Sequence, residues 1–160
     1  MDSFLQKAAE ISQQHPKPDV KFSYGTAGFR MRADHLDSVM YRMGLLAVLR
    51  SKAKDGKVIG AVVTASHNPV HDNGVKLVDP LGEMLQFSWE KHASDLANAE
   101  DIVEVLKGVA MEHDIDWSVP AKVFIARDTR PSGAQFVKAL MDGVQALGGS
   151  CHDYGESSSL

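Results

Sequence analysis

Short runs of β-branched residues alternate with amphipathic helical segments along this chain, and that alternation restricts the folds available to it. Two such runs, at 58–63 and 122–126, are each followed by a polar loop, as is typical of buried strands. Helical periodicity marks residues 36–50 and the stretch from Ser132 to Gly148. Strand–loop–helix units in succession predict an α/β fold: a three-layer α/β/α domain with a mostly parallel mixed sheet.

Length and composition fit one folded domain. The chain has 160 residues, 44% of them hydrophobic and 24% charged, which is typical of a globular chain with a single core. Apolar residues at helical spacing predict a first helix over 3–15, which Pro16 and Pro18 end. We therefore divide the chain into a helix and lead-in over 1–20, a main domain over 21–155, and a short carboxyl-terminal end over 156–160.

Charge and cysteine content narrow the function classes. The formal net charge is −4, so no basic field draws the chain to nucleic acid or to an anionic membrane. No stretch approaches the roughly 18 apolar residues of a membrane-spanning helix, and the first residues lack a signal-peptide pattern. The single cysteine, Cys151, excludes an intrachain disulfide and indicates a reducing compartment. We expect a cytoplasmic protein, and nothing in the pattern determines an oligomeric state.

Residues 64–69, Thr-Ala-Ser-His-Asn-Pro, form the most distinctive loop of the chain. They follow the run at 58–63, and open α/β sheets bind ligands beyond the carboxyl ends of their strands. Beyond Ser66 come His67, an Asn-Gly pair at 73–74 that we interpret as a turn, and Lys76. This combination indicates a nucleophile loop in which Ser66 carries a phosphoryl group.

Acyl transfer is the competing chemistry for Ser66, and the sequence disfavours it. A serine hydrolase needs a base that accepts the hydroxyl proton, but the ring of the adjacent His67 is expected to project away from Ser66. No Gly-x-Ser-x-Gly elbow frames the serine either. Phosphoryl transfer instead relies on positioning and on cations that stabilise negative charge.

Four cations stand near predicted strand or loop ends: Arg30, Lys76, Arg127 and Arg130. Their placement favours phosphate chemistry. Two alternatives stay open at this point. Arg127, Asp128 and Arg130 could form a structural ion-pair cluster that only holds loops, and the Gly-x-x-Gly stretch before Arg30 could be a plain turn rather than a phosphate cradle.

Three motifs together resemble the α-D-phosphohexomutase family. The loop at 64–69 resembles the family's phosphoserine loop, and residues 25–30 and 127–132 resemble two further motifs of its first domain. The resemblance runs from about residue 24 to residue 155. Here the Arg-Asp-x-Arg motif follows the serine loop, an order similar to one branch of the family. The fold that this resemblance implies is the family's first domain.

The resemblance implies a mutase that interconverts N-acetylglucosamine 6-phosphate and 1-phosphate through a sugar bisphosphate, on the route to UDP-N-acetylglucosamine. Phosphorylated Ser66 would donate its phosphoryl group and later recover another. Mg²⁺ would bind through the phosphate on Ser66, with its remaining ligands in a second domain. The implied partners are therefore phosphosugars.

The resemblance also assigns roles to individual residues. Lys76 would act as general acid and base, although a simple phosphate-pairing cation is nearly as well supported, because an amine acts as a base only after losing its proton. Arg30 and His67 would line the active site. Substrate binding and support of the loop would come from the remaining motif residues: Thr64, Asn68, Arg127, Asp128 and Arg130.

Family members have four domains, and this chain resembles the first alone. Its last residues, Glu156-Ser-Ser-Ser-Leu160, diverge from the family pattern, so we expect an early end and a chain that is inactive alone. A non-catalytic anion-binding or interaction module derived from that domain is the alternative, and it predicts an unphosphorylated Ser66. Residues 86–118 receive no functional interpretation, and His92 and His113 are expected to be surface histidines.

Overall fold

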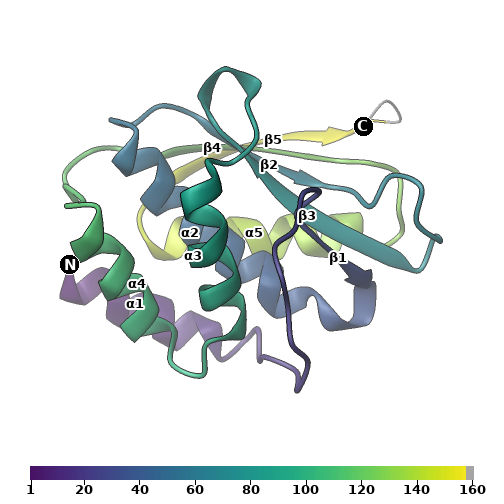
Figure 1. Cartoon of the computed structure of the whole chain (residues 1–160), viewed down its shortest axis with the longest axis horizontal. Helices are drawn as coiled ribbons and strands as arrows, with labels where there is room; N and C mark the ends of the chain where they lie inside the picture. Colours follow the sequence, from purple (N-terminus) through teal and green to yellow (C-terminus); the bar gives the residue numbers. More distant parts are fainter. Residues whose placement is uncertain (158–160) are drawn as a thin grey trace.

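A five-stranded mixed sheet, in the order β1-β3-β2-β4-β5, lies above the helices in the view of Figure 1. The computed structural model describes residues 1–157. Its strands are β1 Phe29–Arg32, β2 Ile59–Val63, β3 Asp72–Val78, β4 Lys122–Arg127 and β5 Ser150–Glu156. Its helices are α1 Asp2–Ser12, α2 Asp37–Ala53, α3 Phe87–Asn98, α4 Ile102–Glu112 and α5 Gly133–Ala146, with short 3-10 turns η1 Ala33–His35 and η2 Pro80–Gly82.

Strand direction confirms the mixed, mostly parallel sheet. β4 pairs in parallel with both β2 and β5, while β3 runs antiparallel to its neighbours β1 and β2. Four of the five strands therefore point the same way, and β3 is the exception. The last strand extends through Glu156, so the predicted end over 156–160 begins inside the sheet, and residues 158–160 lie outside the described residues.

All five helices lie on one side of the sheet in Figure 1. α2 and α5 pack directly against the strands, while α1, α3 and α4 pack against α2, α5 or one another, farther from the sheet. On the side away from the helices Phe124 and Tyr154 are exposed. Within residues 1–157 the sheet therefore has its helices on one face and exposed side chains on the other.

α2 is buried on all sides, because sheet and helices surround it. Fifteen of its 17 residues are buried, including three cations. Arg42 Nη1 donates to the carbonyl oxygens of Leu96, Ala97 and Ala99, and Arg50 forms a bidentate pair with Asp79 at 2.9 and 2.8 Å. A helix that is buried all round belongs at the centre of a fold. These contacts give the buried Arg42 and Arg50 hydrogen-bond acceptors, although Arg42 Nε has no partner among residues 1–157.

Glycines allow α2 and α5 to approach each other closely. A Cβ at Gly44 would collide with the carbonyl oxygen of Leu140, and one at Gly143 would collide with that of Tyr41. The two helix backbones therefore touch where each carries a glycine. This contact sets the spacing of the helical layer that supports β2 and β4.

Gly44→Ala is expected to lower the free energy of unfolding by about 2–3 kcal/mol, because the added methyl group forces the two backbones apart. Gly108→Ala is the matched control. Gly108 also lies inside a helix, but a Cβ there meets nothing within 4 Å, so the substitution should stabilise by roughly 0.5–1 kcal/mol. Urea denaturation measures both, and an unchanged midpoint for Gly44→Ala would show that the helices do not touch there.

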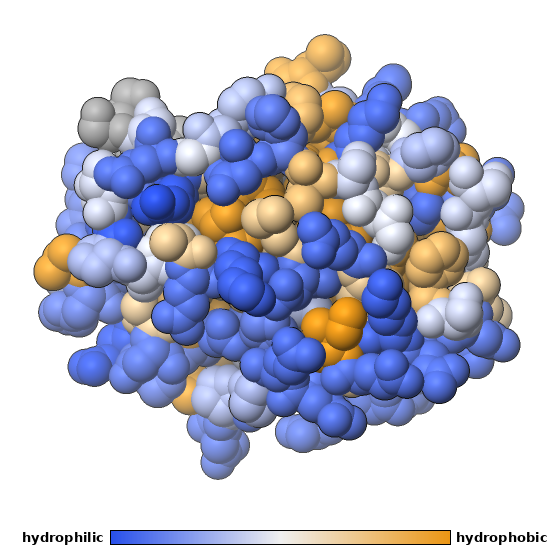
Figure 2. Space-filling model, turned by 180° about the vertical axis from the view of Figure 1, so that it is seen from behind, coloured by the Kyte–Doolittle hydropathy of each residue, from blue (hydrophilic) through white to orange (hydrophobic). Residues whose placement is uncertain are grey.

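The surface seen from behind is mainly hydrophilic, with hydrophobic patches interrupted by polar residues (Figure 2). Within residues 1–157 no helix combines the length and the apolar character needed to cross a membrane.

Candidate active site

The loop between β2 and β3 presents Ser66 to solvent at the carboxyl end of β2. Ser66 has a φ of 48°, in the left-handed region that residues with a Cβ seldom adopt. Its backbone N–H donates to Thr64 Oγ1 at 3.1 Å, and the N–H of Asn68 donates to the carbonyl of Ala65 at 3.0 Å. A strained backbone conformation at an exposed residue persists only where the surroundings hold it, and such strain concentrates at functional sites.

Arg130 holds this loop by donating hydrogen bonds to the loop's backbone carbonyl oxygens. Nη2 donates to the carbonyls of Ser66 at 2.8 Å and Asn68 at 2.9 Å, and Nη1 donates to those of Pro69 and Asp72. The arginine is only 9% exposed. One planar guanidinium therefore fixes four carbonyls of the loop and its return strand, which accounts for the strained turn at Ser66.

Asp128 orients both Arg130 and Thr64. It accepts from Arg130 Nε at 3.3 Å, from the Arg130 backbone N–H at 3.1 Å, and from Thr64 Oγ1 at 2.7 Å. These residues lie at the ends of the neighbouring parallel strands β2 and β4. The structure thus brings Thr64, Asp128 and Arg130 together beneath Ser66.

Arg127 lies apart from this cluster. Its side chain pairs with Glu156 at 3.6 Å and packs against Gly133. The backbone N–H of Ser157 donates to the Arg127 carbonyl at 2.8 Å. Among the described contacts, Arg127 joins β4 to β5 and does not touch the serine loop.

Arg30 approaches the hydroxyl of Ser66 from the edge strand β1. Its Nη2 lies 3.4 Å from Ser66 Oγ, while its Nε is buried with no hydrogen-bond partner among the described residues. Gly74 lies opposite Arg30 in the sheet, and a Cβ there would collide with the carbonyl of Phe29 and approach Arg30 Cγ at 3.0 Å. The glycine therefore makes room for the arginine to cross β3 toward the serine.

Asn73 is a site residue that sequence reasoning missed. It is fully buried, accepts from the N–H of Gly74 at 2.9 Å and donates to Ser132 Oγ at 2.7 Å. The interpretation of 73–74 as a turn was wrong, since both residues lie inside β3. The available signal was a polar Asn-Gly pair directly before alternating apolar residues. Asn73 ties the return strand of the loop to the start of α5.

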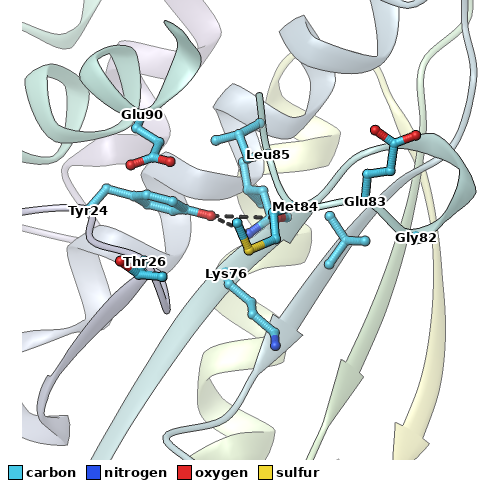
Figure 3. A pocket seen from close by; sticks show the side chains of 10 residues that line it. Tyr24, Thr26, Lys76, Gly82, Glu83, Met84, Leu85 and Glu90 are labelled. Carbon is cyan, nitrogen blue, oxygen red and sulfur yellow. Dashed lines mark hydrogen bonds between the residues drawn. The ribbon is translucent and has the colours of Figure 1, made fainter. Parts of the chain in front are cut away.

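Lys76 and His67 make no hydrogen bond to Ser66 in the described part of the chain. His67 is exposed beside Ser66. Lys76 lies opposite Val62 in the sheet and lines a cavity of about 110 Å³ with Tyr24, Thr26 and Glu83. Figure 3 shows its amine directed away from Tyr24 and Met84. No residue of 64–69 lines this cavity, which lies along β3 where residues 76–78 pair with residues 60–62 of β2.

Tyr24 anchors the wall of that cavity to β3. Its hydroxyl accepts from the N–H of Leu77 at 3.0 Å and lies 3.5 Å from the Leu77 carbonyl (Figure 3). Burial raises the pKa of Tyr24 to about 12. The folded chain therefore keeps this proton after the unfolded chain has lost it, and the associated stability declines as pH rises from about 10 toward 12.

Tyr24→Phe is expected to lower the free energy of unfolding at pH 8 by about 1–2 kcal/mol, because the N–H of Leu77 loses its partner. The difference from wild type should shrink above pH 10. Tyr154→Phe, at a tyrosine that is 61% exposed, should change stability by less than about 0.5 kcal/mol. Urea denaturation at pH 8 and pH 11 tests this, and equal effects of the two substitutions would contradict it.

Comparison with known proteins shows which proteins this chain resembles. Residues 41–104 match the family Phosphoglucomutase/phosphomannomutase, alpha/beta/alpha domain I. A solved apo-form N-acetylglucosamine-phosphate mutase of the alpha-D-phosphohexomutase superfamily superposes with a TM-score of 0.93 and 50% identity, over 96% of this chain and 35% of its own. Residues 41–104 thus resemble domain I of this family, and the fold of the chain is that of the corresponding part of the solved mutase.

In sequence the chain is similar to one part of the phosphoacetylglucosamine mutases. The mutase of Sus scrofa is 57% identical over 154 residues, covering 94% of this chain and 28% of the relative. An N-acetylphosphoglucosamine mutase of Aspergillus fumigatus, solved in complex with GlcNAc-6P and magnesium, shows 48% identity and a TM-score of 0.90, over 95% of this chain and 28% of its own. The chain thus spans about 28% of the length of this curated relative.

Proposed function

We propose that this chain is the phosphoserine-bearing domain of a phosphoacetylglucosamine mutase and that Ser66 carries the transferred phosphoryl group. The observation that supports this most is the strained, exposed Ser66, held by Arg130 with Arg30 Nη2 at 3.4 Å from its Oγ. Phosphoryl transfer depends on such positioning and on nearby cations.

In the proposed reaction the sugar hydroxyl oxygen forms a new bond to phosphorus as the bond to Ser66 Oγ breaks. The hydroxyl proton passes to a base, and a sugar bisphosphate results. Transfer of the other phosphoryl group back to Ser66 then releases the isomeric monophosphate. Arg30 would pair with the phosphate oxygens, which would give its buried Nε an acceptor. His67 and Asn68 would contact substrate at the rim of the loop.

Lys76 is proposed to assist as general acid and base or as a phosphate-pairing cation. Its place on β3, beyond the return of the serine loop, supports either role. Arg127 is proposed to support the site indirectly, through the β4–β5 edge where it pairs with Glu156. A second candidate function, a non-catalytic anion-binding module, would use the same cations without phosphorylation of Ser66.

Magnesium would supply charge stabilisation during the transfer. The residues present do not form its site alone, because the carboxylates bonded to the loop have other partners: Asp72 accepts from Asn68, and Asp128 accepts from Thr64 and Arg130. The phosphate on Ser66 would be one ligand, and the remaining ligands would lie outside residues 1–157. Cytoplasmic location is also part of the proposal, supported by the single cysteine.

A domain exchange tests the proposed function. The segment of the Sus scrofa enzyme that matches this chain is replaced by the chain, and conversion of N-acetylglucosamine 6-phosphate to the 1-phosphate is followed by ³¹P NMR with Mg²⁺. We expect turnover within about 10-fold of the parent enzyme, which corresponds to a change in activation free energy of at most about 1.4 kcal/mol. A folded chimera that converts glucose 6-phosphate but not the acetylated sugar would overturn the substrate assignment. A folded chimera that converts neither would overturn the function.

A further inference from the structure

Two histidines and a glutamate converge on one point between α3 and α4, on elements that contribute nothing to the serine loop. His92 comes from α3, Glu112 is the last residue of α4, and His113 follows it directly. The expectation that both histidines lie on the surface holds only in part: the side chain of His92 is 12% exposed and that of His113 is 25% exposed. Packing of the end of α4 against α3, which the sequence does not display, covers most of each side chain.

The three converging atoms form a nearly equilateral triangle. His92 Nε2 lies 2.9 Å from His113 Nε2 and 3.0 Å from Glu112 Oε2, and His113 Nε2 lies 2.9 Å from the same oxygen. Each Nε2 carries at most one hydrogen. With both nitrogens protonated, each can donate to the carboxylate, but no proton then joins the two nitrogens. With one protonated, the other nitrogen turns a lone pair toward a carboxylate lone pair.

In each of these protonation states at least one pair of the three atoms therefore faces each other without a hydrogen bond. A cation at the centre of the triangle would instead be attracted to the lone pairs of all three atoms. Among residues 1–157 this is the one group of three or more His, Cys, Asp or Glu side chains whose ligand atoms all lie within 4.8 Å of one another.

A buried tryptophan holds both rings in place. Trp89 is 1% exposed and packs edge-on against His92 at 5.3 Å and tilted against His113 at 4.6 Å. The guanidinium of Arg50 lies over the Trp89 ring, 4.9 Å from its centroid. Side chains locked by packing are pre-organised for ligation. Glu112, 61% exposed, leaves one side open to solvent.

The donor set selects among metals. Two imidazole nitrogens and one carboxylate oxygen suit Zn²⁺, whereas Mg²⁺ and Ca²⁺ prefer all-oxygen sites. Tetrahedral bonds of about 2.0–2.1 Å hold ligand atoms about 3.3 Å apart, so the triangle needs to widen by only a few tenths of an ångström. The exposed Lys91 beside the site is paired with Asp95 at 2.5 Å, which offsets its charge.

We propose that His92, Glu112 and His113 bind one Zn²⁺ ion, with water in the fourth position, and that this ion clamps the end of α4 to α3. The site is separate from phosphoryl transfer. It predicts that zinc stabilises the folded chain, since an ion that binds the folded state alone raises its stability.

Calorimetric titration of the metal-free chain with ZnCl₂, together with thermal unfolding, tests the proposal. We expect one Zn²⁺ per chain, a higher melting temperature, and a visible absorption spectrum typical of nitrogen and oxygen ligation when Co²⁺ is used instead. Millimolar Mg²⁺ should not displace the zinc. Absence of stoichiometric zinc binding by the folded chain would overturn the proposal.

Variants locate the site. His113→Gln and Glu112→Gln should each weaken zinc binding at least ~10-fold. His35→Gln should leave it unchanged, because the side chain of His35 is 37% exposed and its ion pair is with Asp34, at 3.9 Å, rather than with a proposed ligand. Glu112 is mostly exposed, so Glu112→Gln keeps the test valid even where His113→Gln impairs folding. Equal losses in all three variants would show adventitious binding to surface histidines, and no loss in either ligand variant would refute the site.

Discussion

Ser66→Ala in the domain-exchange chimera should reduce mutase turnover at least ~10³-fold, because in the proposed reaction the Ser66 hydroxyl carries the phosphoryl group. The fold should persist, since the side chain of Ser66 is exposed and its hydroxyl makes, among residues 1–157, only the 3.4 Å contact with Arg30. ³¹P NMR measures the loss of turnover, and circular dichroism confirms folding. Retained turnover in the folded variant would remove Ser66 from the reaction.

Ser66→Gly separates chemistry from backbone strain. Glycine adopts a φ of 48° without steric cost, so this variant should be as inactive as Ser66→Ala but more stable than it, by up to about 1 kcal/mol. Urea denaturation of the two variants measures the difference. Equal stabilities would show that the left-handed turn stores no strain.

Arg130→Ala should destabilise the chain by about 3–5 kcal/mol, because it leaves the buried Asp128 carboxylate and the loop carbonyls without their shared donor. Arg130→Lys should recover little of this, since an ammonium group cannot reproduce a planar fork that serves four carbonyls. Both variants should also lose turnover in the chimera, because Ser66 is no longer held in its strained position.

Arg32→Ala is the matched control for Arg130. Arg32 pairs with Asp34 at 3.3 Å, but both side chains are more than 60% exposed, so its removal should cost no more than about 1 kcal/mol. Urea denaturation compares the variants. An Arg130→Ala variant as stable as Arg32→Ala would mean that the carbonyl contacts contribute nothing to folding.

Much of the fold follows from local pattern. The β-branched runs locate β2 and β4 to within a residue, and helical periodicity locates α2 and α5. β1 was missed because Phe29–Arg32 alternates apolar residues with arginines after a glycine turn, and it becomes a strand only through pairing with β3. Long-range pairing of this kind leaves no local signal.

The candidate site was predictable where topology alone decides it. The serine loop and the Arg-Asp-x-Arg motif each follow one of two strands, β2 and β4, that pair in parallel, so their carboxyl ends meet. The role of Arg130 as a clamp on four carbonyls was not predictable, because it depends on how the loop backbone turns. Likewise, nothing in the sequence shows that Trp89 gathers His92 and His113.

Intact mass of the purified chain tests the central claim most directly. The chain is incubated with glucose 1,6-bisphosphate or an N-acetylglucosamine bisphosphate and Mg²⁺, and any added phosphate is located by peptide mapping. The proposed role of Ser66 predicts one phosphate, on Ser66 and absent from Ser66→Ala. A folded chain that gains no phosphate, or gains it on another residue, would contradict the assignment of Ser66 as the phosphoryl carrier of this domain.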